Sequence, residues 1–322
     1  MSTSRNRIII ERLILAAGFS TMAFLIWRFD PGTVWAQISS VGWGLLIILV
    51  MQIFDHMLNA LGWRFAFSAQ DARDIPLRLL LKGRIAGDGV NYLTPSASIA
   101  GELIRPGMLG DIKSSEVKNS SVVIAKFSQA LGQALFILLG AAVLAYCGLN
   151  FLPWTHSLLA AAAAALIIIA VAAALYLLTS HGKRGDLLWK SGAALGALRG
   201  QMRLYLRRHP GRFAASALLF CAGYAGGAVE AFIICYFMGM PVSPLTALLI
   251  EALSNIIDSL LFMVPAKAGT QEAGKMAIFH GLGLGAGAGL AFGLIRHTRE
   301  IAWACAGFLI YTLNRGRITP RR

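Results

Sequence analysis

Apolar residues run in long blocks along the chain, and short polar segments separate the blocks. A membrane-spanning helix needs about 20 mainly apolar residues, and several blocks reach that length. The segment from Phe127 to Gly182 contains no Asp, Glu, Lys or Arg, which leaves room for two spans and a turn. We therefore expect an all-α polytopic membrane protein with about six spanning helices. The expected spans are residues 9–27, 41–63, 126–146, 160–178, 213–238 and 284–313.

The composition supports a membrane protein, because 57% of the 322 residues are hydrophobic and only 14% are charged. Soluble domains carry far more charge. The net charge of +14 is typical of cytoplasmic loops rich in Lys and Arg, and the alternative is attraction to anionic lipid headgroups. The four cysteines lie in or at the ends of apolar blocks without metal-ligand spacing. We expect them to be packing residues, and we expect no metal and no cofactor.

Two similar segments lie 170 residues apart, at 88–105 (DGVNYLTPSASIAGELIR) and 258–275 (DSLLFMVPAKAGTQEAGK). Each has Asp, six residues, Pro, six residues, Glu, two residues, and then Arg or Lys. In both, an apolar run leads into a proline and small residues, followed by a charged helix start. The repetition predicts two broken, re-entrant helices from two structural repeats, an arrangement that builds the substrate site in many transporters. The matched pairs are Asp88 and Asp258, Pro95 and Pro265, Glu102 and Glu272, and Arg105 and Lys275.

A basic segment at 183–212 separates the repeats, with eight Lys or Arg against one acid. Its leucines recur at helical spacing, so we expect an amphipathic cytoplasmic linker between a first repeat, 1–182, and a second, 213–322. The positive-inside rule places both termini, the loop at 64–84 and the linker in the cytoplasm. The chain would then cross the membrane three times between the two breaks. Three is odd, so the repeats are inverted, and we expect the bacterial inner membrane as the location.

Charged residues cluster at the two breaks, although each costs about 2.5–3.5 kcal/mol at the centre of a spanning helix. The clustering predicts a water-filled polar cavity, while the alternative is mutual neutralisation of residues three or four apart. Helices beginning near Gly101 and Thr270 would direct free N–H groups into the cavity, which suits a phosphate. Other charges lie inside apolar blocks: Glu230, Arg296, His297, Arg299 and Glu300. The expected substrate-binding residues are Arg84, Asp88, Asn91, Thr94, Ser96, Glu102, Arg105, Lys126, Asp258, Lys267, Thr270, Glu272 and Lys275, and the helix-break residues are Pro95, Gly101, Pro265 and Gly269.

Two glycine-containing motifs need separate interpretation. Residues 269–275, GTQEAGK, are close to a phosphate-binding loop, but Met276 stands where Ser or Thr would bind magnesium, and no strand precedes the motif. We therefore expect no ATP hydrolysis. The glycines at 281, 285, 289 and 293 recur every four residues, which predicts a helix-packing face.

The stretch GDGVNYLTPSASIAGELIR (87–105), with VPAKAGTQEAG (264–274), resembles the lysylphosphatidylglycerol-synthase transmembrane family, also called flippase-like. The resemblance covers nearly the whole chain. Members occur alone, including a subgroup associated with hopanoid synthesis, or fused to a soluble aminoacyl-transferase domain. In the fused enzymes the membrane part is taken to flip the lipid product. Because this chain ends at Arg322, just after its last expected span, we expect no synthase activity.

These observations favour a lipid flippase that acts without ATP and is not an enzyme. Aminoacyl-phosphatidylglycerol, a polyprenyl-phosphate-linked lipid and a hopanoid are the candidate cargoes. We expect membrane lipids as binding partners and no nucleic acid, and a second copy or lipid-synthesis enzymes are further candidates. One alternative is a membrane-embedded lipid or glycan transferase that uses Asp55, His56 or the Glu102/Arg105 group; Asp55 and Asn59, one turn apart, share a helix face. Another is a non-catalytic subunit of a lipid-synthesis complex.

Overall fold

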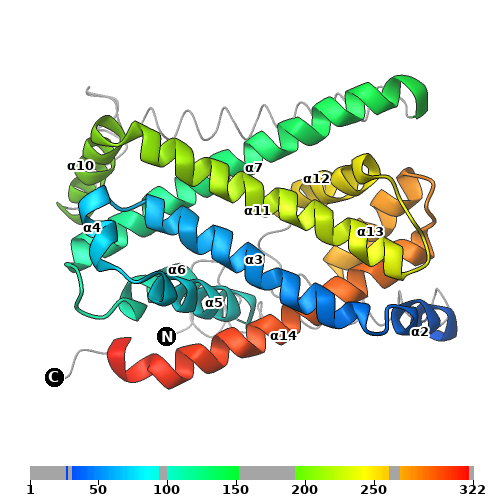
Figure 1. The fold of residues 1–322 in the computed structure, drawn as a ribbon, viewed down its shortest axis with the longest axis horizontal. Helices are drawn as coiled ribbons and strands as arrows, with labels where there is room; N and C mark the ends of the chain where they lie inside the picture. The colour runs from blue at the N-terminus through cyan, green and yellow to red at the C-terminus, as the bar shows by residue number, and fades with distance from the viewer. Residues whose placement is uncertain (1–26, 28–30, 94–99, 152–192, 261–268, 319–322) are drawn as a thin grey trace, which may run out of the picture. The chain divides into compact units, whose positions relative to one another are not determined.

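The computed structural model describes residues 27, 31–93, 100–151, 193–260 and 269–318. Within these ranges every regular element is a helix, which confirms the all-α prediction (Figure 1). The helices are α2 (Pro31–Ser40), α3 (Gly44–Phe65), α4 (Ala69–Asp74), α5 (Leu77–Leu93), α6 (Ala100–Met108), α7 (Ser115–Phe151), α10 (Ala193–Arg208), α11 (Pro210–Phe237), α12 (Pro244–Leu260), α13 (Thr270–Gly281) and α14 (Ala286–Ile318).

Three of the described helices are long and apolar enough to cross a membrane: Gly44–Phe65, Ser115–Val143 within α7, and Pro210–Phe237. They match three of the expected spans. Helix α7 begins earlier than expected, because the Ser114 hydroxyl accepts a hydrogen bond from the Val117 N–H at its start. Helix α14 has 33 residues, which at 1.5 Å per residue is about 50 Å. The expected spans at 9–27 and 160–178 lie outside the described residues.

The chain forms two compact units, and each unit draws on both halves of the sequence. The first unit contains residues 1–54, 85–104 and 225–316, and the second contains residues 55–84, 105–224 and 317–322. The boundary falls inside α3, α5, α6, α11 and α14, so these helices contribute to both units. The division into two inverted repeats stays a prediction.

At both expected breaks a short helix follows the break. The described parts of the helices before the breaks, α5 and α12, have 17 residues each. The helices after them, α6 and α13, have 9 and 12 residues. The repeated glutamate is the third residue of each short helix, and Arg105 or Lys275 is the sixth. Pro95 and Pro265 lie between the helices, outside the described residues, and the re-entrant course stays a prediction.

In the second unit the linker helix α10 packs its apolar face into the core. Met202 and Tyr205 are buried with Trp63. The Tyr205 hydroxyl donates to the Phe65 carbonyl at the end of α3. Burial raises the pKa of Tyr205 to about 12, so the hydroxyl remains a neutral donor.

Arg212, just after the linker helix, binds the same end of α3. Its guanidinium donates to the carbonyls of Phe67 and Arg64 at 2.8 and 3.0 Å. The last carbonyls of a helix lack N–H donors within the helix and favour a cation. The basic linker therefore caps the C-terminal end of α3 as well as carrying positive charge.

A surface ion pair joins helix α4 to the turn before α7. Lys113 Nζ lies 2.9 Å from Asp71 and 2.7 Å from Asp74. Partial burial raises the pKa of Asp71, but hydrogen bonds from Ser68 and Lys113 outweigh this effect and hold that pKa below its usual value. The hydrogen bonds to Asp74 and Asp71 raise the pKa of Lys113.

We expect Asp71→Asn to lower the melting temperature by at most a few degrees, because exposed ion pairs contribute little. The stabilisation from a lowered carboxyl pKa is fully present above about pH 4, and it is lost as the pH falls through the folded-state pKa. The stabilisation from a raised lysine pKa is fully present below about pH 10, and it is lost as the pH rises through the folded-state pKa. The difference between wild type and variant should therefore be constant from pH 5 to 9 and vanish in acid. Thermal unfolding in detergent across that range measures it, and a difference that persists at pH 3 would contradict the assignment.

Candidate functional site

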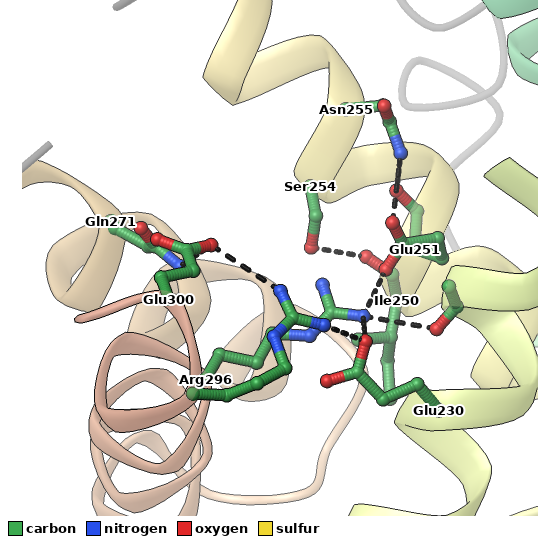
Figure 2. A network of polar contacts seen from close by, with 10 residues as sticks. Glu230, Ile250, Glu251, Ser254, Asn255, Gln271, Arg296 and Glu300 are labelled. Carbon is green, nitrogen blue, oxygen red and sulfur yellow. Dashed lines mark hydrogen bonds and ion pairs between the residues drawn. The ribbon is translucent and has the colours of Figure 1, made fainter. Parts of the chain in front are cut away.

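A buried charge network occupies the first unit, with Arg296 of α14 at its centre. Figure 2 shows its guanidinium between two glutamates from different helices. Its Nη2 lies 2.6 Å from Oε2 of Glu251 on α12 and 3.5 Å from Oε2 of Glu230 on α11. The same nitrogen donates to the Gly227 carbonyl at 2.9 Å. One cation therefore joins three helices.

Two further residues of α14 extend the network. Arg299 forms an ion pair with Glu230, and its Nη2 lies 3.5 Å from Oε1 of Glu300. Glu300 accepts a hydrogen bond from the Gln271 amide of α13 at 3.2 Å. Residues 296, 299 and 300 share one helix face because they are three and four positions apart.

The imidazole of His297 links the network to both breaks. Its Nδ1 lies 2.8 Å from Oε1 of Glu272, the third residue of α13 after the second break. Its ring is 6.0 Å from the ring of Tyr92, in an edge-to-face arrangement. Tyr92 stands at the end of α5, just before the first break. The first unit thus brings side chains from beside both breaks to one residue of α14.

Glycines in α14 allow this approach. A Cβ at Gly289 would lie 2.5 Å from the Lys275 carbonyl, and one at Gly293 would lie 3.2 Å from Cα of Glu272. These two glycines therefore form a packing face, as expected. The four-residue stripe is otherwise wrong: Gly281 ends α13, and Gly285, with φ +89°, lies in the turn before α14. The turn interrupts the helix that the stripe assumed.

A side chain from α5 caps the helix that follows the first break. The Gly101 N–H donates to Oδ1 of Asn91 at 2.6 Å, so one N–H that we expected to be free at the start of α6 is already satisfied. A Cβ at Gly101 would lie 2.0 Å from the Gly87 carbonyl. At the second break, Gly269 adopts φ +74° as the N-cap of α13 and provides no side-chain cap.

The structure separates the expected site residues into three groups. Thr94, Ser96 and Lys267 lie outside the described residues, together with both prolines. Arg84, Arg105 and Lys126 belong to the second unit. The others are in the first unit: Asp88, Asn91, Glu102, Asp258, Thr270, Glu272 and Lys275.

Burial distinguishes the first-unit residues. Glu272 is 0% exposed and Lys275 is 1% exposed, whereas Asp88, Glu102 and Asp258 are partly exposed. The described charges of the network are packed against one another. Glu272 and Lys275 are enclosed by protein.

The central residues of the network were not among the expected site residues. Glu251 and Gln271 give no sequence signal beyond being polar within apolar blocks. Arg296, Arg299 and Glu300 did give a signal, since they interrupt the expected span 284–313 where each charge is costly. Such charges in one span require counter-charges from other helices, and sequence position does not reveal which helices those are.

No group of three or more metal-ligating side chains occurs among the described residues. The carboxylates of the network contact guanidinium, amide and imidazole groups. The network can bind and release protons, hold a polar headgroup, or tie helices together.

Long apolar helices that enclose a buried charge network define a polytopic α-helical membrane protein. A family model described as "Lysylphosphatidylglycerol synthase TM region" matches residues 9–306, and the chain belongs to this family. Searches of curated proteins and of solved structures returned no match.

Proposed function

We propose that this protein is a lipid flippase that moves an amphiphilic lipid across the bilayer without ATP. The observation that supports the proposal most is the meeting of Tyr92, His297 and Glu272. Tyr92 precedes the first break and Glu272 follows the second, and both contact one imidazole. A shared polar site at two helix breaks is the arrangement expected of a transporter substrate site.

The cost of burying the network charges also supports a role in transport. Glu230, Glu251 and Arg296 are at most 10% exposed at their side chains, and burying charges costs several kcal/mol per ion before pairing offsets it. Replacing such ion pairs by apolar residues is often neutral or stabilising. Charges that a fold could replace as a pair by apolar residues fit a role in which they exchange contacts with a passing headgroup.

The basic residues after each break suit the headgroup. Arg105 and Lys275 occupy the same position of α6 and α13, and each of these cations, like Arg84 and Lys267, would suit a phosphate or another anion. Asp88, Glu102, Asp258 and Glu272 would balance these charges when no lipid is bound. The tails would stay in the bilayer while the headgroup passes. We place the protein in the bacterial inner membrane with both termini in the cytoplasm.

Reconstituted protein tests the proposal. In vesicles with a fluorescent lipid, loss of fluorescence to an impermeant quencher reports movement between leaflets. We expect the wild-type protein to raise the rate well above that of empty vesicles. Glu102→Gln and Arg105→Ala should each reduce the rate by at least about tenfold, the effect of losing roughly 1.4 kcal/mol of barrier stabilisation. Glu116→Gln and Arg207→Ala, at exposed positions, are the matched controls.

The choice of labelled lipid identifies the cargo class. Phosphatidylglycerol, its aminoacylated form, a polyprenyl-phosphate carrier and a neutral hopanoid are compared at equal density. Full movement by both site variants while the protein remains folded would exclude the proposed site. Covalent conversion of a lipid, detected by mass spectrometry, would favour the transferase.

A further inference from the structure

We propose that the Glu272–His297 pair is a proton-binding site that couples lipid movement to a proton gradient. The inference rests on the proposed function and adds the driving ion. It starts from the different counter-charges that the buried glutamates have.

Two permanent cations serve three of the carboxylates. Arg296 contacts Glu230 and Glu251, and Arg299 contacts Glu230 and Glu300. A guanidinium stays charged at any accessible pH. Each of these three carboxylates therefore lies beside a permanent cation.

Glu272 lies instead against an imidazole. Its side chain is 0% exposed and its Oε1 is 2.8 Å from Nδ1 of His297, which is itself 6% exposed. Imidazole is the side chain that ordinarily gains and loses a proton between pH 5 and 8. Chains of Asp, Glu and His within membrane helices mark proton relays.

The formal charges of the network favour a proton on the imidazole of the pair. Among the described residues of the network, three buried carboxylates and that of Glu300, which is 19% exposed, accompany two guanidiniums and the ammonium of Lys275, one turn after Glu272. The formal charge of this group is zero only when the imidazole also carries a proton. Loss of that proton leaves one uncompensated negative charge in a buried site, which is costly.

The pair and the charge network draw on five helices. Their charged and titratable groups are Tyr92 on α5, Glu230 on α11, Glu251 on α12, Lys275 on α13, and Arg296, Arg299 and Glu300 on α14, while Asp88 lies one turn before Tyr92 and Cys235 lies near Arg296. Because Tyr92 and Glu272 flank the two breaks, a change of charge at His297 acts where both broken helices meet. Protonation is thereby connected to the segments that would have to move for a lipid to pass.

A pH gradient across reconstituted vesicles tests the coupling. A passive flippase leaves a labelled lipid equally divided between leaflets, whatever the gradient. With one proton per lipid, a gradient of one pH unit can shift the leaflet ratio by up to about tenfold. We expect the wild-type protein to shift the ratio, and a protonophore to remove the shift.

His297→Gln keeps a side-chain donor for Glu272 but cannot be protonated. Because His297 also belongs to the proposed substrate site, this variant should move lipid more slowly, and the movement that remains should show no shift under the gradient. Glu272→Gln should behave in the same way, whereas Glu272→Asp, which keeps a carboxylate, should retain part of the shift. His280→Gln, at the exposed end of α13, should match the wild type.

The outcomes separate the two proposals. Wild-type movement that leaves the leaflet ratio at unity under every gradient overturns the proton coupling and leaves the flippase intact. A full gradient response in His297→Gln moves the proton site elsewhere and overturns the assignment. No movement above empty vesicles with any lipid removes the flippase and the coupling together. Thermal unfolding of each variant in detergent shows whether a lost response reflects a lost fold.

Discussion

Arg296→Met is expected to be the most destabilising single substitution in the charge network. The variant removes the guanidinium that lies 2.6 Å from Glu251. It also removes one of the two cations beside Glu230. Removing one member of a buried ion pair costs about 3–5 kcal/mol, because an uncompensated charge stays in a medium that solvates it poorly. Three helices, α11, α12 and α14, lose their common contact. The measurement is thermal unfolding in detergent, monitored by circular dichroism.

A second substitution distinguishes a lost charge balance from lost packing. Arg296→Met combined with Glu251→Gln removes the stranded negative charge, and Glu230 still has Arg299. The double variant should therefore recover most of the stability lost by Arg296→Met alone. Arg207→Ala, at an exposed position of α10, should leave the melting temperature unchanged. Equal melting of Arg296→Met and the wild type would show that the network does not hold these helices.

The order of helices could be predicted from the sequence because it depends on local patterns. The apolar block at 41–63 became α3, and the expected face shared by Asp55 and Asn59 is confirmed by a 2.9 Å hydrogen bond from the Asn59 amide to the Asp55 carboxylate. The repeated segments also predicted a helix start before each glutamate, and α6 and α13 contain Glu102 and Glu272 in their first turns. Such features are determined by residues close together in the sequence.

The contacts of the charge network depend on residues far apart in the sequence. Arg296 is 45 residues from Glu251 and 66 from Glu230, counting along the chain, and no local pattern indicates which acid a buried cation meets. The same limit applied to the linker. Its amphipathic character was predicted, but the contacts of Tyr205 and Arg212 with the end of α3 are tertiary. Sequence position therefore identified the breaks but not the side chains that join them.

Gly101 lies in the first turn of α6 and packs against α5. Gly101→Ala is expected to abolish lipid movement. A Cβ there would lie 2.0 Å from the Gly87 carbonyl and 2.6 Å from Cγ of Asn91. Backbone atoms cannot yield to such a contact, so α6 must move away from α5 and lose the hydrogen bond from its first turn to Asn91. Overpacking of this kind costs about 1–3 kcal/mol or more, and the displacement occurs next to Glu102. We expect the flipping rate in vesicles to fall to that of empty vesicles, with a lower melting temperature.

Gly200→Ala is the matched control, since Gly200 is also a helical glycine but a Cβ there meets nothing within 4 Å. It should keep full activity and gain slightly in stability from the better helix propensity of alanine. Full flipping by Gly101→Ala would mean that the close approach of α5 and α6 is not required for transport.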